Sequence, residues 1–366
     1  MTAAAHKPIT IIGGGLAGLT LGIGLRQRGI PVTIWEAGAY PRHRVCGEFI
    51  SGRGEAVLGR MGLLELLRGA RATSARTAAF YLDRKASPVH VLPAPAICLA
   101  RFALDALLAQ RFRDLGGELR ENARWLEART PITRQPDSPN TPRPPQAPEG
   151  VVRASGRRLQ LRESGRQWFG LKIHAHNVPL AADLEVHCTP SGYVGLCRLP
   201  KDTVNICGIF RSPAAAQSGA RSGLALLRGR ESSALGQRLA AAEFVTTSFC
   251  SVAGMSLRPL RATGRGEFCI GDALTMIPPV TGNGMSMAFE AAELAIEPVA
   301  AYSQGQLTWT AARRSVAEAC DLRFACRLAW AKWLQWLLCN PVLQATCGAR
   351  LLHSGALWRT LFTRTR

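Results

Sequence analysis

Hydrophobic and polar positions near the N-terminus follow first the period of a strand and then that of a helix. The short apolar run at residues 9–12 is typical of a strand buried in a parallel sheet. Apolar positions then recur at helical spacing over residues 16–28, and a turn at Gly29 separates them from a second apolar run at residues 32–35. The pattern predicts a strand–helix–strand unit at the start of the chain.

Three glycines in the spacing GxGxxG mark the turn from the first strand into the helix. The first permits a tight turn, the second lets the backbone approach a pyrophosphate, and the third lets helix and strand pack closely. An acid after the second strand stands where a ribose hydroxyl is bound in such units, and the helix N-terminus offers N–H groups to phosphates. The unit predicts a dinucleotide site, NAD or FAD, at Gly13, Gly15, Leu16, Ala17, Gly18 and Glu36.

The loop after this acid is irregular and basic. Its Arg42 and Arg44 are placed to meet a second phosphate or a ribityl chain, and the alternative is a solvated loop. Further along, residues 131–150 hold seven prolines and predict an extended surface loop within a hairpin.

Alternating patterns in the middle of the chain predict a second, antiparallel sheet between two α/β halves, where it would form the floor or lid of a substrate pocket. The tail after residue 300 has helical spacing. The predicted fold is therefore α/β (α+β), in three parts. These are a Rossmann-like dinucleotide-binding domain (1–80, 95–165 and 250–300), an interleaved antiparallel-sheet substrate domain (81–94 and 166–249) and a helical C-terminal region (301–366).

A second turn from strand to helix is predicted at residues 268–296, and its residue types suit a flavin nucleotide. Asp272 follows an apolar run directly, so its carboxylate can accept a hydrogen bond from a ribityl hydroxyl. Gly282 and Gly284 bring backbone N–H groups and a helix N-terminus against a ring system that becomes anionic on reduction. Because an NAD site would not need this second module, the pair of motifs favours FAD.

The net charge and the cysteine content limit which kinds of partner and metal site we expect. The formal charge is +20, but the basic residues are scattered and form no run of five. This favours a generally basic surface, with contact to an anionic lipid or carrier as the alternative and no nucleic acid. The 11 cysteines form no CxxC pair, so we expect no metal site, reduced thiols and a cytoplasmic location. No signal peptide and no transmembrane run are expected.

The two motifs, together with Arg101 ahead of the run ALDALL, resemble those of a family of FAD-dependent oxidoreductases. The family contains the aromatic-ring flavin monooxygenases (para-hydroxybenzoate hydroxylase-like) and the geranylgeranyl reductases, and the resemblance extends to about residue 298. It implies that the first glycines and Glu36 bind the ADP half of FAD and that Arg101 contacts the flavin. The family's second FAD motif is matched at Gly271, Asp272, Pro279, Gly282, Gly284 and Met285, and Asn283 between its glycines is a further cofactor-binding candidate.

The resemblance leaves two activities open. One is a monooxygenase that hydroxylates a small aromatic or polyketide-like lipophilic metabolite through a flavin hydroperoxide. The other is a reductase that moves hydride between flavin N5 and a carbon–carbon bond, favoured by the Cys-Gly pair at Cys46. NAD(P)H is the expected external donor, although the family's Asp-Gly pair tied to its use reads Ala154-Ser155-Gly156. The WxWxIP signature of the related halogenases is absent.

Candidates for catalysis and substrate contact come from the loop, the middle sheet and the tail. We single out Cys46, His176 and Tyr193, with a buried small residue as the alternative for the cysteine and ordinary sheet structure for the other two. In the tail, Trp330, Trp333 and Trp336 recur at three-residue spacing. They predict either a helix packed on the core or a face that touches a membrane or a lipophilic substrate. The sequence leaves the oligomeric state open.

Overall fold

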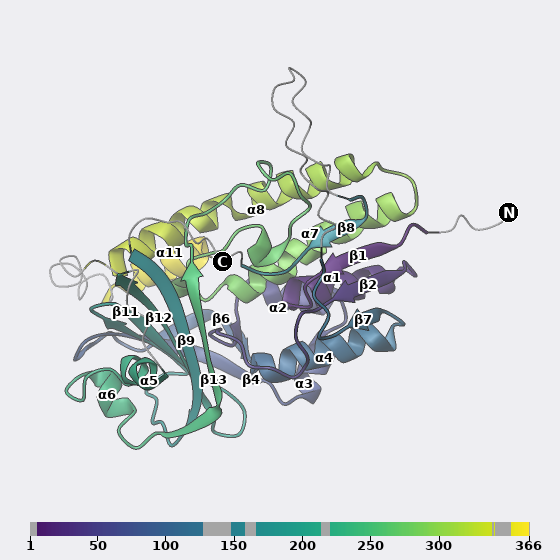
Figure 1. The fold of residues 1–366 in the computed structure, drawn as a ribbon. Helices are drawn as coiled ribbons and strands as arrows, with labels where there is room; N and C mark the ends of the chain where they lie inside the picture. The colour runs from purple at the N-terminus through teal and green to yellow at the C-terminus, as the bar shows by residue number, and fades with distance from the viewer. Residues whose placement is uncertain are drawn as a thin grey trace, which may run out of the picture.

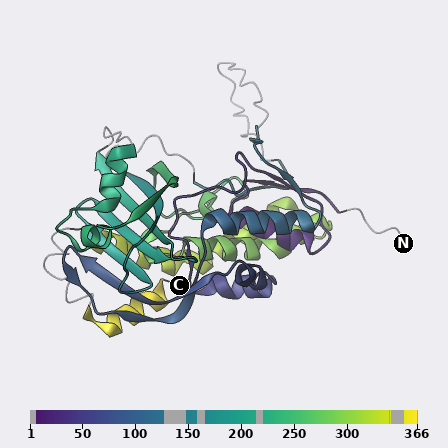
Figure 2. The ribbon, with the colours of Figure 1, turned by 90° about the horizontal axis from the view of Figure 1, so that it is seen from below.

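The computed structural model describes residues 6–126, 148–157, 166–213, 220–338, 340 and 353–365. Two sheets lie at opposite ends of the molecule, and helix α8 (Trp309–Leu338) runs along its length (Figures 1 and 2). Most of the predicted proline-rich loop, residues 131–147, lies outside the described residues.

The smaller sheet is the predicted dinucleotide-binding unit. Its four strands are parallel and stand in the order β7-β2-β1-β8. Their bounds are Ile9–Ile12 for β1, Val32–Trp35 for β2, Glu118–Arg120 for β7 and Val151–Arg153 for β8. The first two strands lie where the hydrophobic pattern predicts them.

Helix α1 (Leu16–Arg26) connects β1 to β2 and packs on two other helices, α4 (Arg101–Asp114) and α7 (Gly284–Ser303). Every residue from Leu16 to Leu25 is buried, which is the pattern of a helix with apolar neighbours all round. The helix therefore belongs to the centre of the core, and its N-terminus is fixed at the carboxyl end of β1.

The larger sheet has nine strands, eight of them in the order β13-β9-β12-β11-β10-β4-β6-β3, with β5 paired to β4. Its pairs are antiparallel, as predicted, except that β10 runs parallel to β4. The strands are β3 (Phe49–Ile50), β4 (Thr73–Leu82), β5 (Lys85–Ala86), β6 (His90–Cys98), β9 (Arg166–His176), β10 (Leu184–Thr189), β11 (Gly192–Arg198), β12 (Val204–Pro213) and β13 (Glu243–Met255). The predicted substrate domain begins at residue 81, whereas this sheet also contains β3 and most of β4, which precede that residue. The predicted division into domains stays a prediction.

Short helices complete the two ends: α2 (Arg53–Arg60), α3 (Leu64–Gly69), α5 (Ala220–Arg228) and α6 (Ala234–Arg238). At residues 268–270, where a strand is predicted, the chain makes a single parallel bridge between Cys269 and Arg153 and then enters the 3₁₀ turn η1 (Gly271–Ala273). A second 3₁₀ turn, η2 (Pro279–Thr281), precedes α7.

The C-terminal region is helical, as predicted, in α8 and in α11 (Gly355–Arg364). Arg327 of α8 makes a buried two-point ion pair with Glu290 of α7, at 2.6 Å on both sides, and so fixes α8 along the core. Of the three predicted tryptophans, Trp333 and Trp336 are 39% and 58% exposed. None of the helices in the described part of the chain is both long and apolar enough to cross a membrane.

Candidate functional site

The glycine turn between β1 and α1 has an open face. Gly13 has φ +105°, and a side chain on Gly18 would lie 2.0 Å from the carbonyl oxygen of Gly13, so both positions require glycine. A Cβ on Gly15, in contrast, would have no heavy atom within 4 Å. The N-terminus of α1 therefore faces free space at the one glycine that the motif assigns to a pyrophosphate.

Glu36, at the carboxyl end of β2, is buried and closes the side of this turn. Its carboxylate accepts hydrogen bonds from the backbone N–H groups of Gly14 at 2.9 Å and Gly38 at 3.0 Å. It also pairs with Arg42 at 2.5 Å and with Arg44 at 3.5 Å. The predicted basic loop thus folds back onto the predicted ribose-binding acid.

A buried carboxylate that sequence reasoning missed joins this loop to α4. Asp105, which is fully buried, makes a two-point pair with Arg101 at 2.6 and 2.8 Å and accepts from Nε of Arg44 at 3.1 Å. Its place one helical turn after Arg101 is the signal that could have identified it. Asp105 therefore positions two of the predicted cofactor-binding arginines.

The two motifs, some 250 residues apart in sequence, meet at the start of α1. A Cβ on Gly271 would touch the Cβ of Ala17 at 2.9 Å. The side chain of Asp272 is exposed, yet the protein around it removes enough water to raise its pKa, while Arg157 and Arg101 act in the opposite direction. An exposed carboxylate with a raised pKa is the signature of a group that faces a cleft.

The turn before α7 is tied to the end of β3. Gly282 has φ +63°, and Asn283 is the N-cap of α7, fully buried. Ser286 on the first turn of α7 donates to the backbone oxygen of Ser51, and Ser51 Oγ lies 3.4 Å from the backbone oxygen of Gly282. The second motif and the loop after the first motif therefore form one surface.

These residues fit an FAD. The space at Gly15 accepts a pyrophosphate without a clash, and the Nε of Arg42 is buried without a hydrogen-bond partner within the described residues. A donor left in this state beside Glu36 indicates an acceptor that arrives with a ligand. Asp272 keeps an exposed carboxylate for a hydroxyl group.

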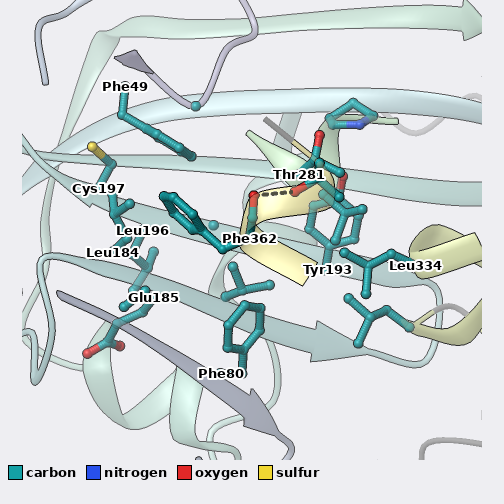
Figure 3. Close-up of a pocket in the computed structure, with 18 of the residues that line it drawn as sticks. Phe49, Phe80, Leu184, Glu185, Tyr193, Leu196, Cys197, Thr281, Leu334 and Phe362 are labelled. Carbon is teal, nitrogen blue, oxygen red and sulfur yellow. Dashed lines mark hydrogen bonds between the residues drawn. The ribbon is translucent and has the colours of Figure 1, made fainter. Parts of the chain in front are cut away.

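An apolar cavity lies between the larger sheet and the C-terminal helices. One end of it is lined by Gly47 and Phe49 and by the turn Pro279–Thr281, which belong to the two cofactor segments. Aromatic rings surround the space in Figure 3, among them Phe49, Phe80, Tyr193 and Phe362. A concave wall of mostly apolar and aromatic side chains is typical of sites that bind small apolar molecules.

The three predicted catalytic residues lie in different places. Tyr193 on β11 is buried and lines the cavity. Cys46 is half-buried beside Gly47, its Sγ accepts from the N–H of Glu48 at 3.4 Å, and the surrounding protein raises the pKa of its thiol. His176 ends β9 opposite Glu243 and does not line the cavity. Each role stays a prediction. Among the three, only Tyr193 lines the cavity, whereas Cys46 lies next in sequence to the lining residue Gly47.

The neighbouring histidine, His174, belongs instead to a buried ionisable cluster behind the Cys46 loop. Its Nε2 lies 2.6 Å from Oε2 of Glu48, and Nζ of Lys172 lies 3.4 Å from Oε1 of the same carboxylate. Nζ of Lys172 also lies 3.0 Å from Nδ1 of His43. Within the described residues, no group of three or more histidine, cysteine or acidic side chains is arranged to hold a metal ion.

The pKa of His43 predicts that the fold loses stability in acid. Burial, followed by the charges of Lys172 and His174, lowers the pKa of His43 to about 4. In the unfolded chain histidine titrates near its ordinary value of about 6.5, so unfolding takes up a proton between these two pH values. Stability should therefore fall as the pH is lowered from about 6.5 to about 4.

The variant His43→Gln tests this expectation. Urea unfolding midpoints measured at pH 7 and at pH 4.5 should differ less for the variant than for the natural protein, because glutamine does not titrate. If the two proteins lose the same stability over this range, His43 is not responsible for the acid sensitivity.

Comparisons with known proteins agree with this geometry. Residues 11–47 match the family model described as an NAD(P)-binding Rossmann-like domain. A comparison with curated protein sequences finds no match. Among solved structures, a triple mutant of the flavin-dependent brominase Bmp2 is similar with a TM-score of 0.70 and 18% identity, covering 94% of this chain and 93% of that one.

Two further solved structures are similar over almost their whole length. The p-nitrophenol 4-monooxygenase PnpA from Pseudomonas putida DLL-E4 has a TM-score of 0.71 at 15% identity, covering 98% of this chain and 97% of that one. PqsL from P. aeruginosa, solved with 2-aminobenzoylacetate, has a TM-score of 0.64 at 17% identity, covering 94% of this chain and all of its own. The chain therefore combines an NAD(P)-binding Rossmann-like segment with the overall fold of flavin-dependent monooxygenases and halogenases.

Proposed function

We propose that the protein is an FAD-dependent monooxygenase that hydroxylates a small aromatic or polyketide-like lipophilic molecule. The observation that carries this proposal is the position of the apolar cavity. Its end is lined by Gly47, Phe49 and the turn Pro279–Thr281, so a molecule in the cavity would meet the reactive edge of a flavin held by those segments. The fold shared with flavin-dependent monooxygenases supports it.

The residues divide between binding the cofactor and shielding the reaction. When bound, FAD would supply the redox and oxygen chemistry. The N-terminus of α1 at Gly15 would hold the pyrophosphate, Glu36 a ribose hydroxyl and Asp272 a ribityl hydroxyl. The apolar walls would exclude water from the reacting centre, and the hydroxyl of Tyr193 would orient a polar group of the substrate.

A reductase acting on a carbon–carbon bond is the second candidate. The observation that favours it is the Cys46-Gly47 pair, since Gly47 lines the cavity and the pair matches the reductase branch of the resembling family. Halogenation is less well supported, because the chain has no WxWxIP signature although halogenases share the fold.

The electron donor, the location and a membrane contact are further parts of the proposal. We propose NAD(P)H as the external donor and a cytoplasmic location, which the nine free cysteines among the described residues support. The exposed rings of Trp333 and Trp336 support a peripheral membrane contact through α8.

The proposal is tested first on the purified protein. We expect a flavin absorption spectrum that NADH or NADPH bleaches under argon, and a protein that neither carries nor binds FAD would end every flavin hypothesis. With a turned-over substrate, incubation under ¹⁸O₂ separates the two candidates. One labelled oxygen atom in the product is expected for the monooxygenase, and an unlabelled reduced product would assign the reductase.

A further inference from the structure

The C-terminal helix α11 forms one wall of the cavity. Trp358, Leu361 and Phe362 of this helix, and Thr365 just after it, line the space directly. The helix packs against β6 and the end of α8 (Figure 1), and Phe362 points towards the centre of the cavity in Figure 3. Residues 358–365 are therefore part of the proposed substrate site, although they lie far in sequence from both cofactor motifs.

Aromatic contacts hold this wall in place. The ring of Trp358 stacks on that of His90 with centroids 5.1 Å apart and an interplanar angle of 20°, and it meets Phe80 edge-on at 5.3 Å. Its Nε1 lies 3.4 Å from the backbone oxygen of Val91. Both His90 and Phe80 also line the cavity. Trp358 thus occupies space that the sheet alone would leave open.

The wall is also tied to the second cofactor motif. Nδ2 of Asn283 donates to the backbone oxygen of Thr365 at 2.7 Å, in a buried position. Asn283 is the N-cap of α7, next to the glycines assigned to the flavin ring. The position of α11 is therefore set from the same turn that would set the position of the cofactor.

The charge of the wall restricts what can bind. Glu185 is the one Asp, Glu, Lys or Arg among the described residues that line the cavity, and its carboxylate points away from the aromatic rings in Figure 3. That carboxylate is bound on the far side by His187 at 2.9 Å and by Arg238 at 3.1 Å. Apart from His90, whose ring stacks on Trp358, none of these residues can offer a positive charge to the cavity, so an anionic ligand would lose its hydration with little compensation.

We propose that α11 is the specificity wall of this site, that Trp358 is its specificity-determining residue, and that the site selects uncharged aromatic ligands over anionic ones. The inference rests on the proposed function for its assignment of the cavity to the substrate. It excludes the free carboxylate or sulfonate of an aromatic acid as the preferred substrate, and it makes the aromatic surface of α11 the main source of affinity.

The test uses two probes with the same rings. Phenylnaphthylamine is uncharged, whereas anilinonaphthalenesulfonate adds one sulfonate. We expect the full-length protein to bind the first with a rise in fluorescence, and the second to displace it at least about tenfold less well, the factor that corresponds to about 1.4 kcal/mol. Equal displacement by the sulfonate would overturn the selection against anions. The protein's overall charge of +20 attracts that probe, so weaker displacement cannot be attributed to long-range charge repulsion.

Variants then test the role of α11. Trp358→Ala should weaken phenylnaphthylamine binding by about tenfold, and Trp358→Phe, which keeps a ring, by less. Trp336→Ala is the matched control, since Trp336 is exposed on α8 and does not line the cavity. Equal probe affinity in Trp358→Phe, Trp358→Ala and the natural protein would overturn the assignment.

Flavin content is measured on the same samples to keep the two proposals apart. A protein that binds the uncharged probe but no flavin would retain the specificity wall and lose the proposed function. A flavin-loaded protein whose Trp358 variants bind the probe unchanged would leave the proposed function standing and overturn the specificity wall.

Discussion

Replacing Glu48 with alanine is expected to lower the free energy of unfolding by about 3 to 5 kcal/mol, the cost of removing one side of a buried ion pair. Glu48 and Lys172 are both fully buried, and the carboxylate also accepts from the backbone N–H of Arg101 at 2.9 Å and pairs with His174 at 2.6 Å. These partners lower the pKa of Glu48 against the effect of burial. Without the carboxylate, the charge of Lys172 would be left in the core without its acidic partner.

The backbone of Glu48 has a conformation that is unfavourable for a residue other than glycine. Glu48 has φ +61°, a conformation that costs a non-glycine residue roughly 1 kcal/mol. The side chain's bonds therefore stabilise a backbone conformation that the local sequence would not favour, directly after Gly47, which lines the cavity. We expect Glu48→Ala to disturb the cavity end of the loop as well as global stability.

A double-mutant cycle separates the ion pair from the rest. Urea unfolding of Glu48→Ala, Lys172→Met and the double variant should show that the double variant is more stable than the sum of the single losses predicts, by at least about 1 kcal/mol. The control is Glu65→Ala, because Glu65 and Arg68 form an exposed pair, and its loss should stay below about 1 kcal/mol. Additive losses would show that the buried charges do not stabilise each other.

The dinucleotide-binding unit could be predicted from sequence because its determinants are local. The strand period of residues 9–12, the helical period of α1 and the glycines between them lie within one short segment. The pairing of β1 with β2 follows from the connection itself, since a strand–helix–strand unit places its strands in parallel. The second motif could be located for the same reason, although its position beside Ala17 could not be read from either segment alone.

The ionisable cluster could not be predicted, because its members meet only through the larger sheet. Lys172 and His174 share one face of β9, and the sequence alone leaves His176 on that same face. Which of the three meets Glu48 depends on where the loop after β2 crosses the strand, and that is set by β3 pairing with β6. Sequence reasoning singled out His176 for catalysis, which stays a prediction, and carried no signal that His174 meets Glu48.

The place of the C-terminal helix was equally beyond the sequence. Helical spacing in the tail predicts α8 and α11, but nothing local says that Trp358 should stack on His90 of a strand about 270 residues earlier. Trp333 and Trp336, singled out in the sequence by their three-residue spacing, are exposed. The ring that forms the cavity wall stands alone in sequence and carries no repeating pattern.

The second large effect is expected from a single methyl group at Gly15. Gly15→Ala should raise the dissociation constant for FAD by about a hundredfold, because the methyl group would occupy the space in which phosphate oxygens accept hydrogen bonds from the helix N-terminus. Stability should change little, by no more than about 1 kcal/mol, since Gly15 has a φ of −83° that alanine adopts and a Cβ there meets no atom within 4 Å. Fluorescence titration of the flavin-free protein with FAD and its thermal melting measure the two quantities.

Substitutions at two other glycines serve as controls for this experiment. Gly18→Ala should lose stability together with FAD binding, because its Cβ would lie 2.0 Å from a backbone oxygen, whereas Gly266→Ala, also in open space but outside both motifs, should affect neither. Only a cofactor at the start of α1 predicts that Gly15→Ala separates the two properties, folding normally and binding poorly. If this variant binds FAD as the natural protein does, the space beside Gly15 is not the pyrophosphate site, and the cofactor must be sought along another part of the surface that joins the two motifs.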